Sequence, residues 1–277
     1  MIPRFLKYMR KYCILIPAFI ILYNIPGCEF NHDQSTRNAE VKAMTREMQL
    51  VQDSSYLTIS YVMGQFDPSV HPDFCEIPIK YADRKGMYIR KDALESFKAM
   101  YESALQEGIK LQIRSAARNF EYQKGIWERK WDGSTLLSDG TNVARDVKDP
   151  EEKALRILEF SSMPGTSRHH WGTDIDLNSF NNEWFNKGEG LKLYLWMQFN
   201  ASRFGFCQPY TAFSDERPYG YFEEKWHWTY MPVSKPLTQF AKENIKDEMI
   251  TGFLGSNTAP AIGVVKKYIL GINQNCL

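Results

Sequence analysis

A glycine stands between two potential metal ligands in this chain, and its position constrains the local fold. His169 and Asp176 lie on either side of Gly172. Because glycine interrupts a regular helix, the two side chains are not expected on one continuous helical face. We therefore predict a turn at the histidine that is followed by a strand carrying the acid.

Side chains alternate along such a strand, and this leaves two acids as candidate ligands. Asp174 and Asp176 would point to the same face. The spacing does not choose between them. In a second short window, residues 223–228, an ideal strand would place Glu224 and His227 on opposite faces. A local twist or bulge must therefore turn Glu224 inward if it is to act beside the histidine.

Histidine is sparse, with 5 in 277 residues, yet His169, His170 and His227 fall within two short windows, residues 167–176 and 223–228. Zinc sites in hydrolases use three protein ligands, either histidine nitrogen or carboxylate oxygen, and leave a fourth position for water. His169, His227 and one acid can supply that set. We expect His170 to be a packing residue.

Helical and extended patterns do not alternate regularly along the chain. We expect helices at 91–106, 151–160 and 190–204, a strand at 110–115, and irregular loops at 64–86 and 132–149. This order favours an α+β fold over a doubly wound parallel sheet. A small antiparallel sheet should carry the metal site and be flanked by helices.

The charge balance argues against a nucleic-acid partner. Lysine and arginine total 34 and the acids total 33, which leaves a formal charge of +1. No basic arm accompanies this balance. With 43% hydrophobic residues, the chain has enough apolar surface for a substantial core.

The N-terminus predicts export. Four cations in residues 1–11 precede an apolar run at 13–23, which is typical of a secretory signal, although a simple membrane anchor is an alternative. Ile25-Pro26-Gly27-Cys28 resembles the lipobox of bacterial lipoproteins, which implies a lipid anchor at Cys28 and a place in the cell envelope, periplasmic or membrane-bound. An ordinary cleaved signal with a chance cysteine is the other interpretation.

Export changes the expected chemistry of the remaining cysteines. Cys75, Cys207 and Cys276 would lie in an oxidising compartment. They form no C-x-x-C pair, so a cysteine zinc site is not expected. We predict one disulfide and one free thiol, and the sequence leaves the pairing open.

The two windows resemble the S-x-H-x-x-G-x-A-x-D and E-x-W-H motifs of VanY-type zinc D-alanyl-D-alanine carboxypeptidases and dipeptidases, relatives of the hedgehog and lysostaphin zinc domains. Residues 115–123 are similar to a third motif, S-G-Y-R-S-x-x-x-Q. The resemblance implies that zinc is bound by His169, Asp176 and His227. It also implies that Glu224 is the catalytic acid/base and that Arg118 is both a catalytic residue and a substrate contact.

Further residues of these motifs are implied as substrate contacts, namely Gln123, Ser167 and Trp226. The chain departs from the family pattern in two places. Asp174 stands where the family has a small residue, so it either adds charge near the metal or faces solvent. Ala116 and Ala117 replace Gly-Tyr before the arginine, which changes one wall of the expected pocket.

The resemblance implies hydrolysis of peptidoglycan stem peptides ending in D-Ala-D-Ala. Two alternatives are an endopeptidase with the same zinc core and a zinc-stabilised binding module without turnover. The presence of both Glu224 and Arg118 favours an enzyme, because a structural zinc site needs no general base. We expect a signal at 1–27, a tether with a short helix at 28–60, a zinc peptidase domain at 61–235 and a helical extension at 236–277.

Overall fold

The structure is a computed structural model that describes residues 56–277. The predicted signal at 1–27, the lipidation site Cys28 and all but the end of the 28–60 tether lie outside the described residues. Within the described part of the chain, no helix has both the length and the apolar character needed to cross a bilayer.

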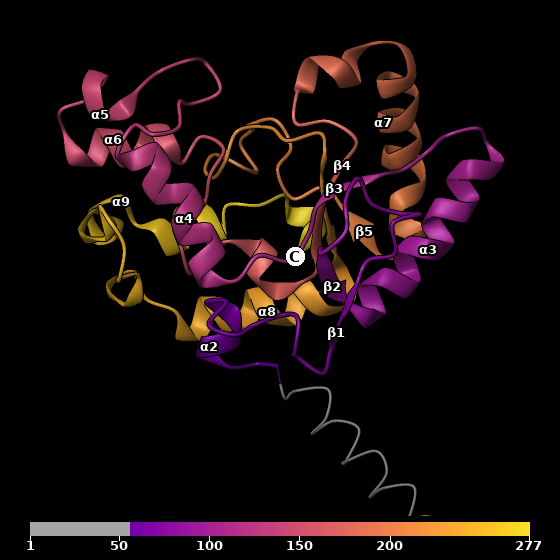
Figure 1. The fold of residues 1–277 in the computed structure, drawn as a ribbon, viewed down its shortest axis with the longest axis horizontal. Coiled ribbons are helices and arrows are strands. Elements are labelled where there is room, and N and C mark those ends of the chain that lie inside the picture. Colours follow the sequence, from indigo (N-terminus) through magenta and orange to yellow (C-terminus); the bar gives the residue numbers. More distant parts are fainter. Residues whose placement is uncertain (1–55) are drawn as a thin grey trace, which may run out of the picture. The chain divides into compact units, whose positions relative to one another are not determined.

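A four-stranded antiparallel sheet lies at the centre of the described part. Its strands are β3 (Ile113–Ser115), β4 (Asp174–Leu177), β6 (His227–Tyr230) and β5 (Phe206–Cys207), in the order β3-β4-β6-β5. Helices lie around this small sheet (Figure 1). The predicted α+β class with a small antiparallel sheet is confirmed.

The register of β4 and β6 separates the sheet into an apolar and a polar face. Ile175 pairs with Trp228, and Asp176 pairs with His227. Ile175 and Trp228 belong to one hydrophobic core, so the acid and the histidine point to the other face. A slip of one residue would reverse both faces, and burial of the apolar pair therefore fixes the polar pair as well.

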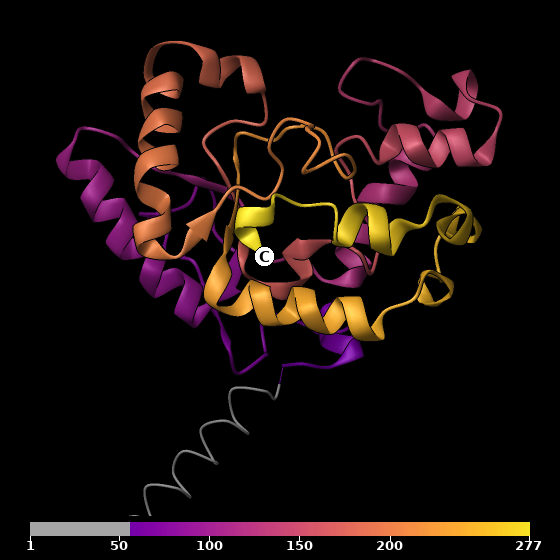
Figure 2. The ribbon, with the colours of Figure 1, turned by 180° about the vertical axis from the view of Figure 1, so that it is seen from behind.

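The first core lies between the sheet and helices α3 (Lys91–Gln106) and α7 (Gly188–Asn200). These helices lie together on one side of the sheet in both views (Figures 1 and 2). Phe97 and Met100 of α3 are fully buried. The helix at 91–106, which was predicted from the helical spacing of its apolar residues, is confirmed.

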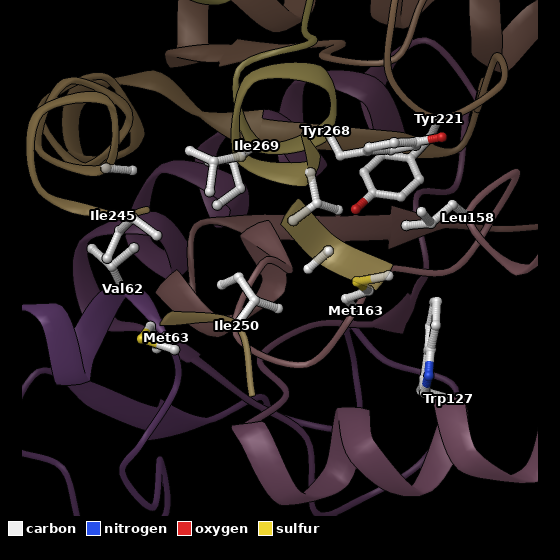
Figure 3. Close-up of a cluster of buried hydrophobic side chains, with 14 of the residues drawn as sticks. Val62, Met63, Trp127, Leu158, Met163, Tyr221, Ile245, Ile250, Tyr268 and Ile269 are labelled. Atoms are coloured by element: carbon white, nitrogen blue, oxygen red, sulfur yellow. The ribbon is translucent and has the colours of Figure 1, made fainter. Parts of the chain in front are cut away.

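The second core gathers α2 (Ile59–Val62), α4 (Phe120–Trp131), α6 (Pro150–Ile157) and α8 (Met231–Asn244) with the C-terminal segment. Side chains far apart in sequence meet there, including Trp127, Ile250 and Ile269 (Figure 3). All three are almost completely buried. The C-terminal segment therefore completes a core.

Shorter elements make up the rest of the secondary structure in residues 56–277. They are β1 (Phe74–Glu76), β2 (Tyr88–Arg90), α5 (Val143–Asp146), α9 (Ala259–Ile262), the 3-10 helices η1 (Arg168–Trp171), η2 (Asn182–Asn186), η3 (Ala201–Phe204), η4 (Asp247–Met249), η5 (Ser256–Thr258) and η7 (Gln274–Cys276), and the short π-helix η6 (Val265–Ile269). Two loop predictions need correction. The 64–86 segment contains β1, which pairs with β2, and the 132–149 segment contains α5.

The predicted boundary between 235 and 236 falls inside α8, which runs through Pro236. Val233 and Leu237 are buried in the same core on either side of that position. A disulfide also ties the C-terminal segment to the sheet. Cys207 of β5 pairs with Cys276, whereas Cys75 is free. The expectation of one disulfide and one free thiol is confirmed.

Candidate functional site

Three side chains from separate elements meet on the polar face of the sheet. His169 comes from the turn η1, Asp176 from β4 and His227 from the start of β6. One ligand atom from each lies within 4.8 Å of the others. Gly172 ends the turn with φ of 69°, and a Cβ there would meet the Phe74 ring at 2.2 Å. The predicted turn followed by a strand is confirmed.

The hydrogen bonds of the cluster leave atoms free to bind a metal. His169 Nδ1 lies 2.8 Å from the Ala116 carbonyl, so this nitrogen donates and Nε2 is left as the free nitrogen. Nε2 lies 3.3 Å from Asp176 Oδ2, and His227 Nδ1 lies 3.3 Å from Asp176 Oδ1. His169 Nε2 and Asp176 Oδ1 are buried without a hydrogen-bond partner. Such orphaned atoms are expected where a cation binds.

Glu224 lies beside the cluster, with Oε2 3.0 Å from His227 Nδ1. The expected local twist or bulge of a strand is not what brings it there. The chain makes a turn between Glu224 and His227. The backbone N–H of His227 donates to the Glu224 carbonyl at 3.2 Å, and β6 begins only at His227. The alternation that separates two residues of a strand therefore does not apply to this pair.

The two acids of β4 have different surroundings. Asp176 faces both histidines and lines a cavity. Asp174 is completely buried and lies 2.8 Å from the other nitrogen of His227, Nε2. The alternative in which Asp174 faces solvent is therefore wrong. Asp174 contacts a candidate ligand from outside the cluster.

The cluster opens into a cavity of about 650 Å³. Every residue that the sequence implied as a metal ligand, acid/base or substrate contact lines it: Arg118, Gln123, Ser167, His169, Asp176, Glu224, Trp226 and His227. In the described part of the chain, eight buried side-chain polar atoms have no hydrogen-bond partner, and six of them belong to residues that line this cavity. Their concentration in one place indicates a ligand site.

Arg118 follows β3 and is held by its backbone. Its N–H donates to the His169 carbonyl at 3.1 Å, and its carbonyl accepts from His170 Nδ1 at 2.6 Å. His170 Nε2 in turn accepts from the Gly165 N–H. Burial lowers the pKa of His170 to about 3, so the ring stays neutral. The expected packing residue therefore also anchors Arg118, whose Nε has no partner.

The structure adds cavity residues that the sequence prediction missed. Lys130 of α4 donates to Ser161 at 2.5 Å, and Tyr210 and Tyr221 form part of the wall. Lys130 lies seven residues after Gln123 on the same helix, about two turns, so the two share a face. That spacing was the only sequence signal for Lys130.

Burial and charge shift the titrating groups in different directions. Burial raises the pKa of Glu224 above its usual value, and His227 offsets this only in part. Burial alone would lower the pKa of His227, but hydrogen bonds to Asp174 and Glu224 raise it to about 10. Burial would raise the pKa of Asp176, yet His169 and His227 hold it below its usual value. The carboxylate of Asp176 therefore stays ionised, as coordination requires.

The chain resembles proteins of known sequence and structure. It is 28% identical over 186 residues to the protein YodJ of Bacillus subtilis, covering 65% of this chain and 59% of YodJ. It is 25% identical over 134 residues to a D-alanyl-D-alanine carboxypeptidase of Enterococcus faecalis, covering 48% of this chain and 45% of that protein. The chain thus spans less than two thirds of either relative.

A solved structure of VanYB in complex with D-Alanine-D-Alanine aligns with a TM-score of 0.45 and 20% identity, over 64% of this chain and 87% of that one. The family model of VanY, described as D-alanyl-D-alanine carboxypeptidase, matches residues 86–233. This range is more than half of the chain and includes every residue of the metal cluster and Glu224. The chain therefore belongs to the VanY family.

Proposed function

We propose that this protein is a zinc-dependent D-alanyl-D-alanine carboxypeptidase that acts on peptidoglycan stem peptides. The proposal depends chiefly on one observation. Buried, unpaired ligand atoms of His169 and Asp176 meet His227 at the cavity, and Glu224 lies 3.0 Å from that histidine. Membership of the VanY family supports the reaction class.

The donor set fits zinc. Two imidazole nitrogens and one carboxylate are a usual set for a catalytic zinc that keeps one position open. When bound there, zinc would lower the pKa of a water molecule towards about 7 and polarise the substrate carbonyl. A structural zinc site is usually closed by four protein ligands, whereas three candidate ligands from the described residues meet here, next to a cavity.

The remaining steps use residues of this chain. Glu224 accepts a proton from the water that attacks the peptide carbonyl, and it then returns the proton to the leaving amine. Burial raises the pKa of Glu224, which makes this carboxylate a stronger base than an exposed glutamate. Arg118 stabilises the negative charge that develops on the carbonyl oxygen.

Two cations in the cavity favour a substrate with a free carboxylate. Arg118 and Lys130 both line it, and within the described residues neither has a carboxylate partner within 4 Å. Burial is the main cause that lowers the pKa of Lys130, and the positive charge of Arg118 lowers it further. The C-terminal carboxylate that a carboxypeptidase substrate provides would compensate part of this positive charge.

Digestion of purified muropeptides tests the proposal. The zinc-loaded protein should remove one terminal D-alanine from a pentapeptide stem, which mass spectrometry of the products detects. Cleavage of cross-bridges in place of terminal residues would favour the endopeptidase alternative. Binding without any product would favour a binding module and contradict the proposal.

We further propose that the protein is exported and attached to a membrane of the cell envelope through a lipid at Cys28. The basic start, the apolar run and Gly27 before the cysteine support this. Each buried methylene of an acyl chain contributes about 0.8 kcal/mol to membrane binding. Mass analysis of the membrane-extracted protein should show an acylated Cys28 at the mature N-terminus. An unmodified Cys28 would contradict the lipid anchor.

A further inference from the structure

The ring nitrogens of His169 and His227 that face away from the other candidate ligands bond to different kinds of group. His169 donates from Nδ1 to the Ala116 carbonyl, which is neutral. His227 Nε2 lies 2.8 Å from Asp174 Oδ2, which belongs to a carboxylate. This acid occupies the position where the VanY-type motif has a small residue. The support of His227 is therefore a feature of this chain beyond the motif.

A network of buried hydrogen bonds fixes the carboxylate of Asp174. Thr173 and Thr229 each donate to its Oδ1 at 2.7 Å, and Arg168 Nε lies 3.3 Å from its Oδ2. All of these residues are at most 1% exposed. Both oxygens thus have partners besides His227, and the carboxylate has little freedom to move.

Arg168 is held just as firmly. Its terminal nitrogens donate to Thr229 at 3.1 Å and Thr238 at 2.9 Å, and its guanidinium lies 4.4 Å from the centre of the Trp171 ring. The positive charge of Arg168 compensates the negative charge of Asp174 in the interior. Asp174 is therefore supplied with its own counter-ion, independent of any metal.

We propose that Asp174 is a positioning residue for the metal site. Its carboxylate accepts the Nε2–H of His227, which orients the ring and leaves Nδ1 as the nitrogen that faces Asp176 and Glu224. Metal-binding histidines gain basicity from such a carboxylate, and loss of the outer partner typically weakens metal binding by about 10- to 100-fold. A small residue at this position would leave Nε2 without this support.

The test is a zinc titration against a competing chelator at saturating and limiting zinc. Asp174→Ala should still bind one zinc at saturation, but with an affinity about 10- to 100-fold below wild type. The zinc affinity of Asp174→Asn should lie between those of wild type and Asp174→Ala, because the amide oxygen still accepts the hydrogen bond but carries no charge. The Co²⁺-loaded variants should also show an altered visible spectrum, which a purely structural role would not produce.

A matched control is Asp73→Asn, which removes a carboxylate from another buried arginine, Arg90, away from the cavity. Its zinc affinity should equal that of wild type. Folded Asp174 variants that bind zinc within about twofold of wild type would overturn the inference. If neither variant folds, ¹⁵N spectra of the histidines in the zinc-loaded wild type decide, since a metal-bound Nε2 on His227 would also overturn it.

This inference rests on the zinc site of the proposed function, and the two can fail separately. A wild-type protein that binds no zinc would contradict the proposed function itself. A wild-type protein that binds zinc, together with Asp174 variants that bind it equally well, would remove only the positioning role of Asp174.

Discussion

Two clusters of buried charge lie side by side on the polar face of the sheet and differ in how their hydrogen bonds are satisfied. The closed cluster consists of Arg168, Asp174, Thr229 and Thr238, whose charged groups all have partners within the cluster. The open cluster consists of His169, Asp176, Glu224 and Arg118, and it contains several unpaired atoms at a cavity. Satisfied buried charges support a structure, whereas unsatisfied ones indicate a missing ligand.

His227 belongs to both clusters. Its Nε2 contacts Asp174 of the closed cluster, and its Nδ1 contacts Glu224 of the open cluster. Substitutions in the open cluster should therefore affect metal binding and turnover at nearly unchanged stability. Substitutions in the closed cluster should mainly lower stability, except at Asp174, whose contact with His227 also links it to metal binding.

The largest effect is expected from Asp176→Ala. This change removes one of three metal ligands, so the purified variant should contain almost no zinc and should lose turnover. Metal analysis by plasma mass spectrometry after dialysis measures the zinc content. Asp174→Ala, treated in the same way with excess zinc, should retain the metal. Equal zinc content in the two variants, both dialysed with zinc in excess, would contradict the difference between the clusters.

Glu224→Gln should leave zinc bound but lower kcat by about 10²- to 10⁴-fold, because the amide does not accept the proton of the attacking water. Steady-state kinetics on a D-Ala-D-Ala peptide, with zinc content measured on the same sample, separates the two effects. Glu223→Gln is the matched control and should remain active. If the Glu223 variant were the inactive one, the general base would be its neighbour.

Arg118→Ala should lower kcat by about 30- to 1000-fold, equivalent to about 2 to 4 kcal/mol of transition-state stabilisation. A role in ground-state binding of the substrate carboxylate would instead raise KM at nearly constant kcat. Arg118→Lys should restore only part of the activity, because a point charge lacks the planar fork of donors. Unchanged kcat and KM in the alanine variant would exclude both roles.

The smallest effect on turnover is expected in the closed cluster. Thr229→Val keeps the side-chain shape but removes a donor to Asp174 and an acceptor for Arg168, so the free energy of unfolding should fall by about 1 to 3 kcal/mol. Denaturant titration measures this loss. Thr135→Val, on the exposed surface, should change stability by less than about 0.5 kcal/mol. Equal effects would contradict the supporting role of the closed cluster.

Features set by local pattern were predictable from the sequence. The helix at 91–106 was predicted because its apolar residues recur at helical spacing. The common face of Asp174 and Asp176 was predicted because side chains alternate along a strand. The turn at Gly172 followed from the same kind of local argument.

Features that depend on distant contacts were not predictable. Periodicity placed Glu224 and His227 on opposite faces, because it carries no signal for the turn between them. The pairing of Cys207 with Cys276 depends on where the C-terminal segment packs. The different roles of Asp174 and Asp176 depend on Arg168, whose direction into the interior has no signature in the pattern.

Crystallographic data collected at the zinc edge on the zinc-loaded protein test the central claim most directly. An anomalous peak is predicted between His169 Nε2, the carboxylate of Asp176 and His227 Nδ1, with Asp174 still bonded to His227 Nε2. A peak coordinated by Asp174 or by His227 Nε2, or no peak in this cavity, would contradict the assignment of the open cluster as the metal site.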